Sequence, residues 1–212
     1  LRCLVGSEMC IRDRCMSDLE KFAHNEDFYF PDLLKIALIH YQFETIHPFL
    51  DGNGRVGRLL IPLFLIEKGV LKKPILYLSD FFEQHRTLYY DNLMRVREKN
   101  DIVQWFKFFL VGIIETTKNS IATFDGILKL QKEIDYQLNK LGRRSGKAKV
   151  LIEQLYQHPV TDAQKVAQIT NLSLTATYKL IEVLEKQGII KEITGARRGK
   201  LYLFERYLRL FQ

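Results

Sequence analysis

The 212-residue chain carries 32 Lys and Arg against 25 Asp and Glu, a formal net charge of +7, and 47% of its residues are hydrophobic. This length suggests one or two domains, because single domains commonly run to about 100 to 200 residues. The apolar fraction and the 27% of charged residues are typical of a globular chain. Charged residues or proline interrupt the longest apolar stretches, so we expect no membrane span.

The first fifteen residues, LRCLVGSEMCIRDRC, contain all three cysteines and show neither helical nor strand periodicity. They resemble translated adapter sequence, so we expect residues 1–15 to be non-native and the natural chain to begin upstream of Met16. Charged residues interrupt any apolar region of a signal peptide. Without this segment no cysteine remains, which excludes a disulfide scaffold or a thiolate zinc site and favours a cytosolic protein.

The excess positive charge lies entirely in the last third of the chain. Residues 1–142 hold 19 basic and 19 acidic side chains, whereas residues 143–212 hold 13 and 6. The junction, LGRRSGKAK at 141–149, is rich in glycine, serine and basic residues, as linkers often are. We therefore predict a first domain over 16–142 and a second over 143–212.

The first domain is predicted to be all α. Residues 31–46 begin with proline and continue apolar almost all round, which predicts a buried helix. A second buried helix is expected over 55–69, kinked by Pro62 in its interior. Further helices fit residues 79–98 and 101–140, the second beginning with aspartate as its N-cap.

The C-terminal part has a different pattern. Thr161 and Gln164 form a capping-box signature for a short helix, a turn follows at 171–172, and Ser173 then caps a longer helix. Two β-like runs, IIKEI and KLYLF, flank the tip TGARRG and predict a hairpin. With a first helix over 146–157, this order predicts a winged helix-turn-helix.

Residues 46–58, IHPFLDGNGRVGR, combine groups suited to phosphate chemistry. Gly52 and Gly54 free the backbone to adopt positive φ and approach a ligand, and the following helix presents unpaired N–H groups. Arg55 and Arg58 lie three apart on one helix face, where each can hold phosphate oxygens bidentately. Two arginines and the loop suit a polyphosphate.

Two further side chains of this stretch can take part in transfer chemistry. Asp51 is the kind of oxygen ligand that Mg²⁺ uses when it is shared with substrate phosphates. His47 can take a proton from an attacking hydroxyl, because histidine titrates near neutral pH. The group predicts phosphoryl or nucleotidyl transfer. The other histidines lack paired ligands at metal-like spacing, so we expect structural or surface roles for them: His24, His40, His85 and His158.

The stretch resembles the Fic family motif, HPFx(D/E)GNGRxxR. It matches at His47, Pro48, Phe49, Asp51, Gly52, Asn53, Gly54, Arg55 and Arg58. The resemblance covers residues 16–212, since MSDLEKF, LYLSDFFEQHRTLYYDNL and the basic tail look like the multi-domain bacterial Fic adenylyltransferases. It implies a mainly α fold, an all-helical Fic domain followed by a winged helix-turn-helix, in a bacterial cytoplasmic enzyme.

The resemblance also implies roles for these residues. His47 would activate a Ser, Thr or Tyr hydroxyl of a target protein, or of the chain itself, which attacks the α-phosphate of ATP and releases pyrophosphate. Asp51 would hold Mg²⁺ against the phosphates, and Phe49 would anchor the loop in the core. The other implied contacts are the anion hole of Gly52, Asn53 and Gly54, the β- and γ-phosphate grip of Arg55 and Arg58, and the adenine neighbours Tyr89 and Tyr90.

Alternative activities stay open. A complete GNGRxxR resembles the adenylylating members rather than the Doc-type kinases, which transfer the γ-phosphate. Many relatives carry an inhibitory glutamate in an (S/T)xxxE(G/N) motif, and no glutamate here precedes Gly or Asn. Removal of AMP, which uses that glutamate, therefore ranks last. The flap that positions targets lies just before Met16 in similar proteins, so we expect this chain to keep its nucleotide groups but to dock targets poorly.

The second hypothesis is a DNA-binding regulator whose Fic domain senses nucleotide. The basic winged helix suits DNA, but such modules also dock proteins or form homodimers. The side chains expected to approach DNA are Thr175, Thr177, Lys179, Arg197, Arg198 and Lys200.

Overall fold

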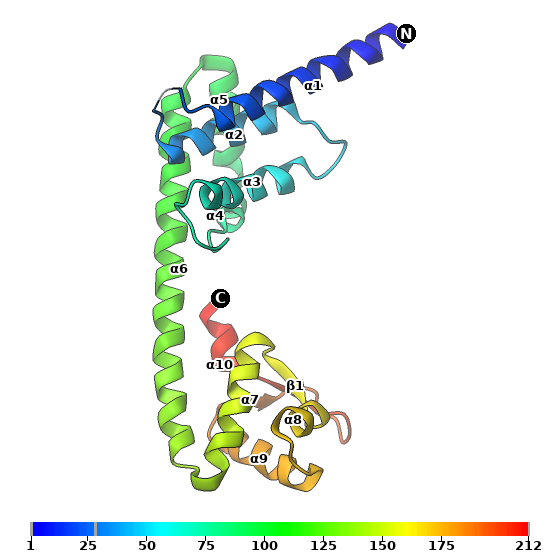
Figure 1. Cartoon of the computed structure of the whole chain (residues 1–212), viewed down its shortest axis with the longest axis vertical. Coiled ribbons are helices and arrows are strands. Elements are labelled where there is room, and N and C mark those ends of the chain that lie inside the picture. The colour runs from blue at the N-terminus through cyan, green and yellow to red at the C-terminus, as the bar shows by residue number, and fades with distance from the viewer. Residues whose placement is uncertain (1, 28, 212) are drawn as a thin grey trace. The chain divides into compact units, whose positions relative to one another are not determined.

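Most of the described residues lie in helices, and three short strands in the last third of the chain form a small sheet (Figure 1). The computed structural model describes residues 2–27 and 29–211, with side chains from Cys10 onward. The predicted mainly α fold is confirmed. None of the helices in this described part is long and apolar enough to cross a membrane.

Two compact units divide between Ser120 and Ile121, inside the longest helix, α6 (Ile102–Asn139). The boundary predicted from the sequence, between residues 142 and 143, lies later in the chain than this division. The C-terminal half of α6 contributes Ile134 and Leu138 to the core of the second unit, which explains why packing separates the units earlier. The extent of the two predicted domains stays a prediction.

The first unit has a core of aromatic and branched side chains. Its helices are α1 (Arg2–His24), α2 (Asp32–Ile46), α3 (Asn53–Glu67), α4 (Leu78–Gln84), α5 (Arg86–Lys99) and the first half of α6. Helices α2 and α3 pack on each other, and Ile36 of α2 and Ile61 of α3 are fully buried. Trp105 of α6 donates a hydrogen bond from Nε1 to the Ala37 carbonyl, 2.9 Å away, which ties α6 to α2.

Both buried helices around the motif are confirmed. Helix α3 continues through the buried Pro62 to Glu67, and the expected kink there stays a prediction. The expected N-cap of α6 is also present, because the Asp101 carboxylate accepts the Gln104 N–H at 3.3 Å.

The single helix expected over 79–98 is wrong. His85 leaves the helical conformation, with φ −110° and ψ 35°, and separates α4 from α5. The break allows Phe82 and Tyr89, which one straight helix would hold apart, to stack with ring centroids 4.6 Å apart. Tertiary packing of aromatic rings thus outweighs the local helical pattern.

The N-terminal segment is helical, contrary to the absence of periodicity read from its sequence. Helix α1 runs from Arg2 to His24, and Leu19 near its end is buried in the core of the first unit. Partly buried Met16 and Phe22 pack against the same core, which supports the helix from its C-terminal end. That residues 1–15 are non-native stays a prediction, and Leu1 lies outside the described residues.

The second unit combines helices with a three-stranded sheet. After α6 come η1 (Gly142–Arg144), α7 (Ser145–Gln157), β1 (Val160–Asp162), α8 (Ala163–Thr170), α9 (Leu174–Lys186), β2 (Lys191–Glu192), β3 (Leu201–Leu203), α10 (Glu205–Leu208) and η2 (Arg209–Phe211). The strands are antiparallel in the order β1-β3-β2, with Tyr202 opposite both Thr161 and Glu192. The expected hairpin is β2 and β3, whereas β1 was not expected because three residues carry too little pattern.

The helix-turn-helix elements are present with one correction. Asp162, not Thr161, caps α8, and its Oδ1 accepts the Lys165 N–H at 2.9 Å. Thr161 is held in β1 by its pairing with Tyr202 and so cannot act as the cap. Ser173 caps α9 as expected. Assignment of this unit to the winged helix class stays a prediction.

Candidate active site

The motif forms the connection between α2 and α3. His47 ends α2 in the left-handed conformation, φ 52°, and Gly52 precedes α3 with φ 84°. Positive φ costs glycine little, whereas a non-glycine residue held there pays on the order of 1–3 kcal/mol. The His47 N–H is retained by a 3.0 Å bond to the Phe43 carbonyl, and its side chain is exposed at the mouth of the loop.

Asn53 fixes the shape of this loop. Its side chain is buried, accepts the Phe49 N–H at 2.8 Å and donates to the Phe49 carbonyl at 2.6 Å. Both polar groups of the amide are therefore used inside the protein. Of the anion-hole contribution expected from Asn53, the backbone N–H at the start of α3 remains, since the first N–H groups of a helix have no intrahelical acceptor.

The expectation that Phe49 anchors the loop in the core is wrong. Its side chain is 48% exposed and lies outside the buried core, with its ring centroid 6.2 Å from that of buried Phe43. Two hydrogen bonds between the Asn53 side chain and the Phe49 backbone, one donated by each, already hold the loop. Polar contacts to the main chain thus replace the expected apolar anchor.

Every residue predicted for the nucleotide site lines one pocket of about 340 Å³ in the first unit. The predicted members are His47, Asp51, Gly52, Asn53, Gly54, Arg55, Arg58, Tyr89 and Tyr90. Sequence reasoning missed four others, Leu50, Phe82, Glu83 and Arg86. Arg86 lies one helical turn before Tyr89, and that spacing is the signal that could have placed it on the pocket face.

Basic groups dominate the pocket. Arg55 pairs with Asp51 at 3.2 Å and Arg86 with Glu83 at 3.7 Å, and all four side chains are largely exposed. Exposed pairs of this kind are worth between zero and about 1 kcal/mol, so each arginine can exchange its carboxylate for another anion. A third guanidinium, that of Arg58, has no carboxylate within ion-pair distance among the residues described from position 10 onward.

The two glycines of the loop make room for these guanidiniums. A Cβ added at Gly52 would lie 3.3 Å from Nη2 of Arg55, and one at Gly54 would lie 3.1 Å from Nη1 of Arg58. Both arginines therefore fold back over the loop backbone. A Cβ at either glycine would require the neighbouring guanidinium to shift by a few tenths of an ångström, and at Gly52 it would also meet an unfavourable positive φ.

Two buried hydrogen bonds of His40 link α3 to Tyr89 in the wall of the pocket. His40 is fully buried, with Nδ1 2.9 Å from the Gly57 carbonyl and Nε2 2.9 Å from the Tyr89 hydroxyl. Burial lowers the pKa of His40 from 6.5 to about 4, so the ring is neutral. Nδ1–H therefore donates to Gly57, and the Tyr89 hydroxyl donates to Nε2. The structural role expected for His40 is the role that it has.

Tyr89 and Tyr90 contribute differently to the pocket wall. Tyr89 is 4% exposed, and burial raises the pKa of its hydroxyl above the ordinary value. Its hydroxyl is already bonded to His40, so it offers a ligand only part of its ring. Tyr90 is 53% exposed and presents its ring to the pocket.

Sequence reasoning missed Glu44, a residue of α2 whose carboxyl lies beside Gly57 of α3. Its Oε1 is buried with no hydrogen-bond partner among the described residues, and a Cβ added at Gly57 would clash with it. Burial raises the pKa of this carboxyl, against the attraction of the Arg58 guanidinium. A Cβ at position 57 would therefore require this carboxyl to move.

The side chains predicted to face DNA separate into two groups. Thr177 is fully buried in α9, because it lies on the face that packs against the core, so its expected contact with DNA is wrong. The others are exposed, namely Thr175, Lys179, Arg197, Arg198 and Lys200.

Residues 12–65 match the model of the Fic/DOC family. A probable protein adenylyltransferase of Aquifex aeolicus (strain VF5) is 56% identical over 41 residues, which cover 19% of this chain and 13% of that protein. The protein adenylyltransferase Fic of Aedes aegypti is 35% identical over 94 residues, 44% of this chain and 17% of that protein. The chain thus spans less than a fifth of the length of either relative.

A solved structure shares the fold. The crystal structure of a Fic family protein from Desulfovibrio desulfuricans G20 superimposes with a TM-score of 0.50 at 19% identity. The match covers 92% of this chain and 55% of that one.

Proposed function

We propose that this chain, whose residues 12–65 belong to the Fic/DOC family, is a protein adenylyltransferase that transfers AMP from ATP to a protein hydroxyl. The observation that carries this proposal is the pocket at the N-terminus of α3, which a histidine, two carboxylates and three guanidiniums line. The acceptors are Ser, Thr or Tyr side chains of a target protein or of the chain itself.

His47 is the general base in this proposal. It takes the proton of the acceptor hydroxyl, whose oxygen bonds to the α-phosphorus of ATP. The bond from that phosphorus to the oxygen bridging to the β-phosphate breaks, and pyrophosphate leaves with the electron pair. The exposed side chain at the pocket mouth supports the role, because an incoming acceptor can reach it.

The phosphates of ATP bind to the loop and the arginines. Arg55 and Arg58 hold the β- and γ-phosphates, and the N–H groups at the start of α3 contact the reacting group. Arg86 supplies another guanidinium to the same pocket. Because Asn53 fixes the loop in advance, little reorganisation is needed when the nucleotide binds.

Asp51 fits a shared Mg²⁺ site. Within residues 10–27 and 29–211 no three His, Cys, Asp or Glu side chains gather as ligands, so the protein alone does not cage a metal. A single exposed carboxylate beside bound phosphates is the arrangement that Mg²⁺ uses with nucleotides. When bound, Mg²⁺ neutralises phosphate charge. Asp51 would then leave Arg55, whose guanidinium turns to the phosphates.

The base of the nucleotide lies against Tyr90 in this proposal. Its exposed ring offers a stacking face, whereas Tyr89 forms the wall behind it. Exchange of adenine for another base is therefore expected to change affinity less than loss of the phosphate contacts, since only one aromatic face is available.

Other parts of the proposal rest on the resemblance of the whole chain. A bacterial cytoplasmic setting follows from the likeness to multi-domain bacterial members and from the absence of cysteine after residue 15. Homodimerisation through the second unit stays a prediction. A DNA-binding regulator with a nucleotide-sensing pocket is the second candidate, and AMP removal ranks last because no glutamate precedes Gly or Asn.

The test is transfer of label from ATP. The purified chain is incubated with Mg²⁺ and either α- or γ-³²P-ATP, alone and with bacterial lysate, and proteins are separated on a gel. We expect label from the α position only, lost in His47→Ala and kept in His24→Ala, an exposed histidine outside the pocket. Label from the γ position would indicate a kinase, and no label with intact ATP binding would favour a nucleotide sensor.

A further inference from the structure

Helix α6 has apolar side chains on two opposite faces. One face carries Trp105 and Phe109 into the core of the first unit, and it carries Ile134 and Leu138 into the core of the second. A helix that covers the core of a globular domain usually has one apolar stripe and a polar opposite side. The second apolar face of α6 is therefore not explained by either core.

The second face follows a seven-residue repeat. We name it the α6 stripe and define it by the residues that share this face: Val103, Leu110, Ile114, Thr117, Ile121, Phe124 and Leu128. From Leu110 onward the spacing alternates between three and four residues, as positions a and d of a coiled coil do. The repeat continues over residues 103–128, which span about 38 Å of helix. A pattern of this length is typical of a helix that pairs with another helix.

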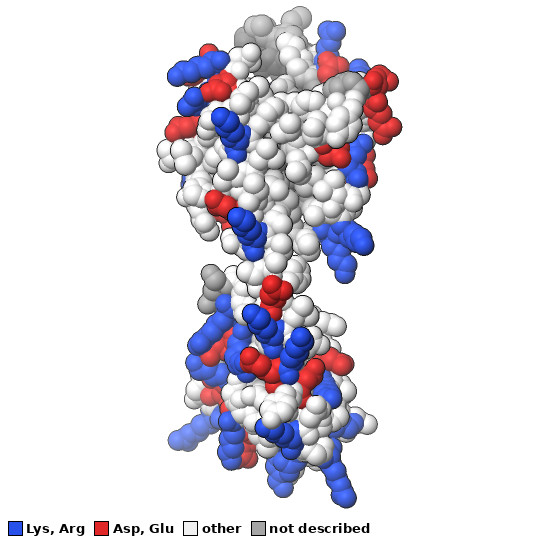
Figure 2. All heavy atoms as spheres, turned by 90° about the vertical axis from the view of Figure 1, so that its left-hand side faces the viewer, with Lys and Arg blue, Asp and Glu red and all other residues white. Residues whose placement is uncertain are grey.

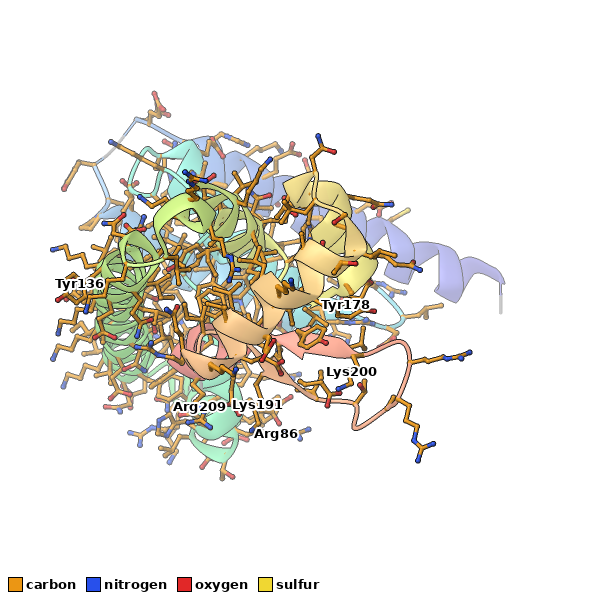
Figure 3. All side chains as sticks on the ribbon, turned by 90° about the horizontal axis from the view of Figure 1, so that it is seen from below. Arg86, Tyr136, Tyr178, Lys191, Lys200 and Arg209 are labelled. Atoms are coloured by element: carbon orange, nitrogen blue, oxygen red, sulfur yellow. The ribbon has the colours of Figure 1, made fainter. Side chains whose placement is uncertain are left out.

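The α6 stripe is exposed to solvent. Five of its six apolar side chains are between 49% and 58% exposed, and Leu110 is half-buried. Figure 3 shows that Tyr136, further along the same helix, points away from α9. Figure 2 is viewed from the side on which α6 lies in Figure 1, and uncharged residues predominate over the first unit in this view. Single exposed apolar residues are ordinary, whereas a continuous row of them marks an interaction surface.

Charged side chains flank the α6 stripe in an order that depends on direction. Lys107 and Lys118 come before Ile121, and Asp125 and Asp135 come after it. All four charged side chains are exposed, and none has an ion-pair partner among the described residues. Lys118 and Asp125 lie seven residues apart, which is about 10 Å along a helix and too far for them to pair within one chain.

The pattern is symmetric about Ile121. Ile114 and Leu128 lie seven residues to either side of it, and Lys107 and Asp135 lie fourteen to either side. When two such helices cross antiparallel at Ile121, the lysines of each helix meet the aspartates of the other. A parallel pair in register would instead bring like charges together at positions 107 and 135. A surface that complements itself in this way is what a two-fold dimer requires.

We propose that the α6 stripe binds the α6 stripe of a second copy of this chain, as an antiparallel two-helix coiled coil. Ile121 lies at the two-fold axis, Ile114 packs beside Leu128 of the partner subunit, and Lys118 pairs with Asp125 of the partner subunit. The contact differs from dimerisation through the second unit, because the α6 stripe begins in the first unit. It uses no residue of the nucleotide pocket, so it does not rest on the proposed adenylylation.

The test is the mass of the full chain in solution as a function of its concentration. Analytical ultracentrifugation follows the chain from low to high micromolar concentration, with a reducing agent that keeps cysteines from linking two chains. Circular dichroism verifies that each variant is folded. We expect a reversible equilibrium between monomer and dimer. Below its dissociation constant the chain is monomeric, and unfolding measured there reports the single chain.

Two pairs of variants test the place and the direction of the contact. Ile121→Glu should raise the dissociation constant about a hundredfold or more, because it buries two unpaired carboxylates at the axis. The control, Val150→Glu, adds the same charge at a 44% exposed position of α7 and should leave the constant unchanged. Lys118→Glu should raise it about tenfold, because the new carboxylate faces Asp125 of the partner subunit. Lys118→Glu combined with Asp125→Lys exchanges the two charges and should restore the dimer.

Four results would overturn the proposal. A folded chain that stays monomeric at the highest concentration would remove it. A dimer that survives Ile121→Glu would place the interface elsewhere, the second unit included. Equal weakening by Ile121→Glu and Val150→Glu would indicate general charge repulsion. Failure of the charge exchange to restore the dimer would contradict the antiparallel direction.

Discussion

At the scale of single residues, two buried polar side chains hold the candidate active site in shape. Asn53 closes the loop through the Phe49 backbone, and His40 links the Gly57 carbonyl to the Tyr89 hydroxyl. The polar side-chain atoms of both residues are hydrogen-bonded within the protein, so none of them is left to bind a ligand. An unpaired buried polar group costs about 1–3 kcal/mol, so loss of either partner is expected to disturb the site as well as the fold.

The buried state of His40 makes stability depend on pH. Its pKa is about 4 in the folded chain and near 6.5 when unfolded, so the unfolded state binds the proton more readily. The contribution of the neutral ring to the free energy of unfolding is complete above pH 6.5 and is lost as the pH falls toward 4. The total loss is about 3 kcal/mol. We expect the free energy of unfolding to fall over this window in urea titrations, and less so in His40→Gln.

A direct measurement separates this cause from the titration of carboxylates. The ring protons of His40, followed by NMR in the folded chain, should not titrate until pH approaches 4. An ordinary titration of His40 near pH 6.5 would contradict the buried, neutral assignment. This readout also serves if His40→Gln does not fold.

At the scale of secondary-structure elements, the packing of α3 against α2 is close at Gly57. A Cβ at Gly57 would clash with the Glu44 carboxylate and lie 3.2 Å from the Phe43 ring, so Gly57→Ala must shift these two side chains of α2. We expect a loss of about 1–3 kcal/mol of unfolding free energy from this overpacking. Gly146 in α7 has no atom within 4 Å of its Cβ position, so Gly146→Ala should instead stabilise by about 0.5–1 kcal/mol.

Opposite signs for these two substitutions are the critical result, measured by urea unfolding of both variants. If Gly57→Ala were as stabilising as Gly146→Ala, helix propensity rather than close packing would govern both sites. Transfer of label from ATP should fall only in Gly57→Ala, because α3 carries Arg55 and Arg58.

Elements with strong local signals were predictable, and those made by tertiary contacts were not. The apolar run of 32–46 and the glycine-rich turn before α3 indicated two helices and a phosphate-binding loop. The break at His85 arises from aromatic stacking across the core, and β1 exists only because it pairs with β3. Likewise the pocket residues of the motif lie together in sequence, whereas Arg86 reaches the pocket through the folding of α5.

The whole molecule has two cores that share one long helix. Trp105 lies in the first core, and Ile134, also on α6, is buried in the second. Trp105 is the single tryptophan of the chain, so its fluorescence reports the first unit, whereas far-ultraviolet circular dichroism reports helices in both. A difference between the two transitions would therefore show that the cores unfold separately.

Ile134→Ala should destabilise the second unit by about 2–5 kcal/mol, because it removes buried methyl and methylene groups and leaves a cavity. We expect the urea transition seen by circular dichroism to broaden or divide, with its first part at lower urea, while the Trp105 midpoint stays near that of the parent chain. Ile121→Ala, at a 56% exposed position on the same helix, is the control and should shift neither probe. A common shift of both probes in Ile134→Ala would mean that α6 couples the two cores into one cooperative unit.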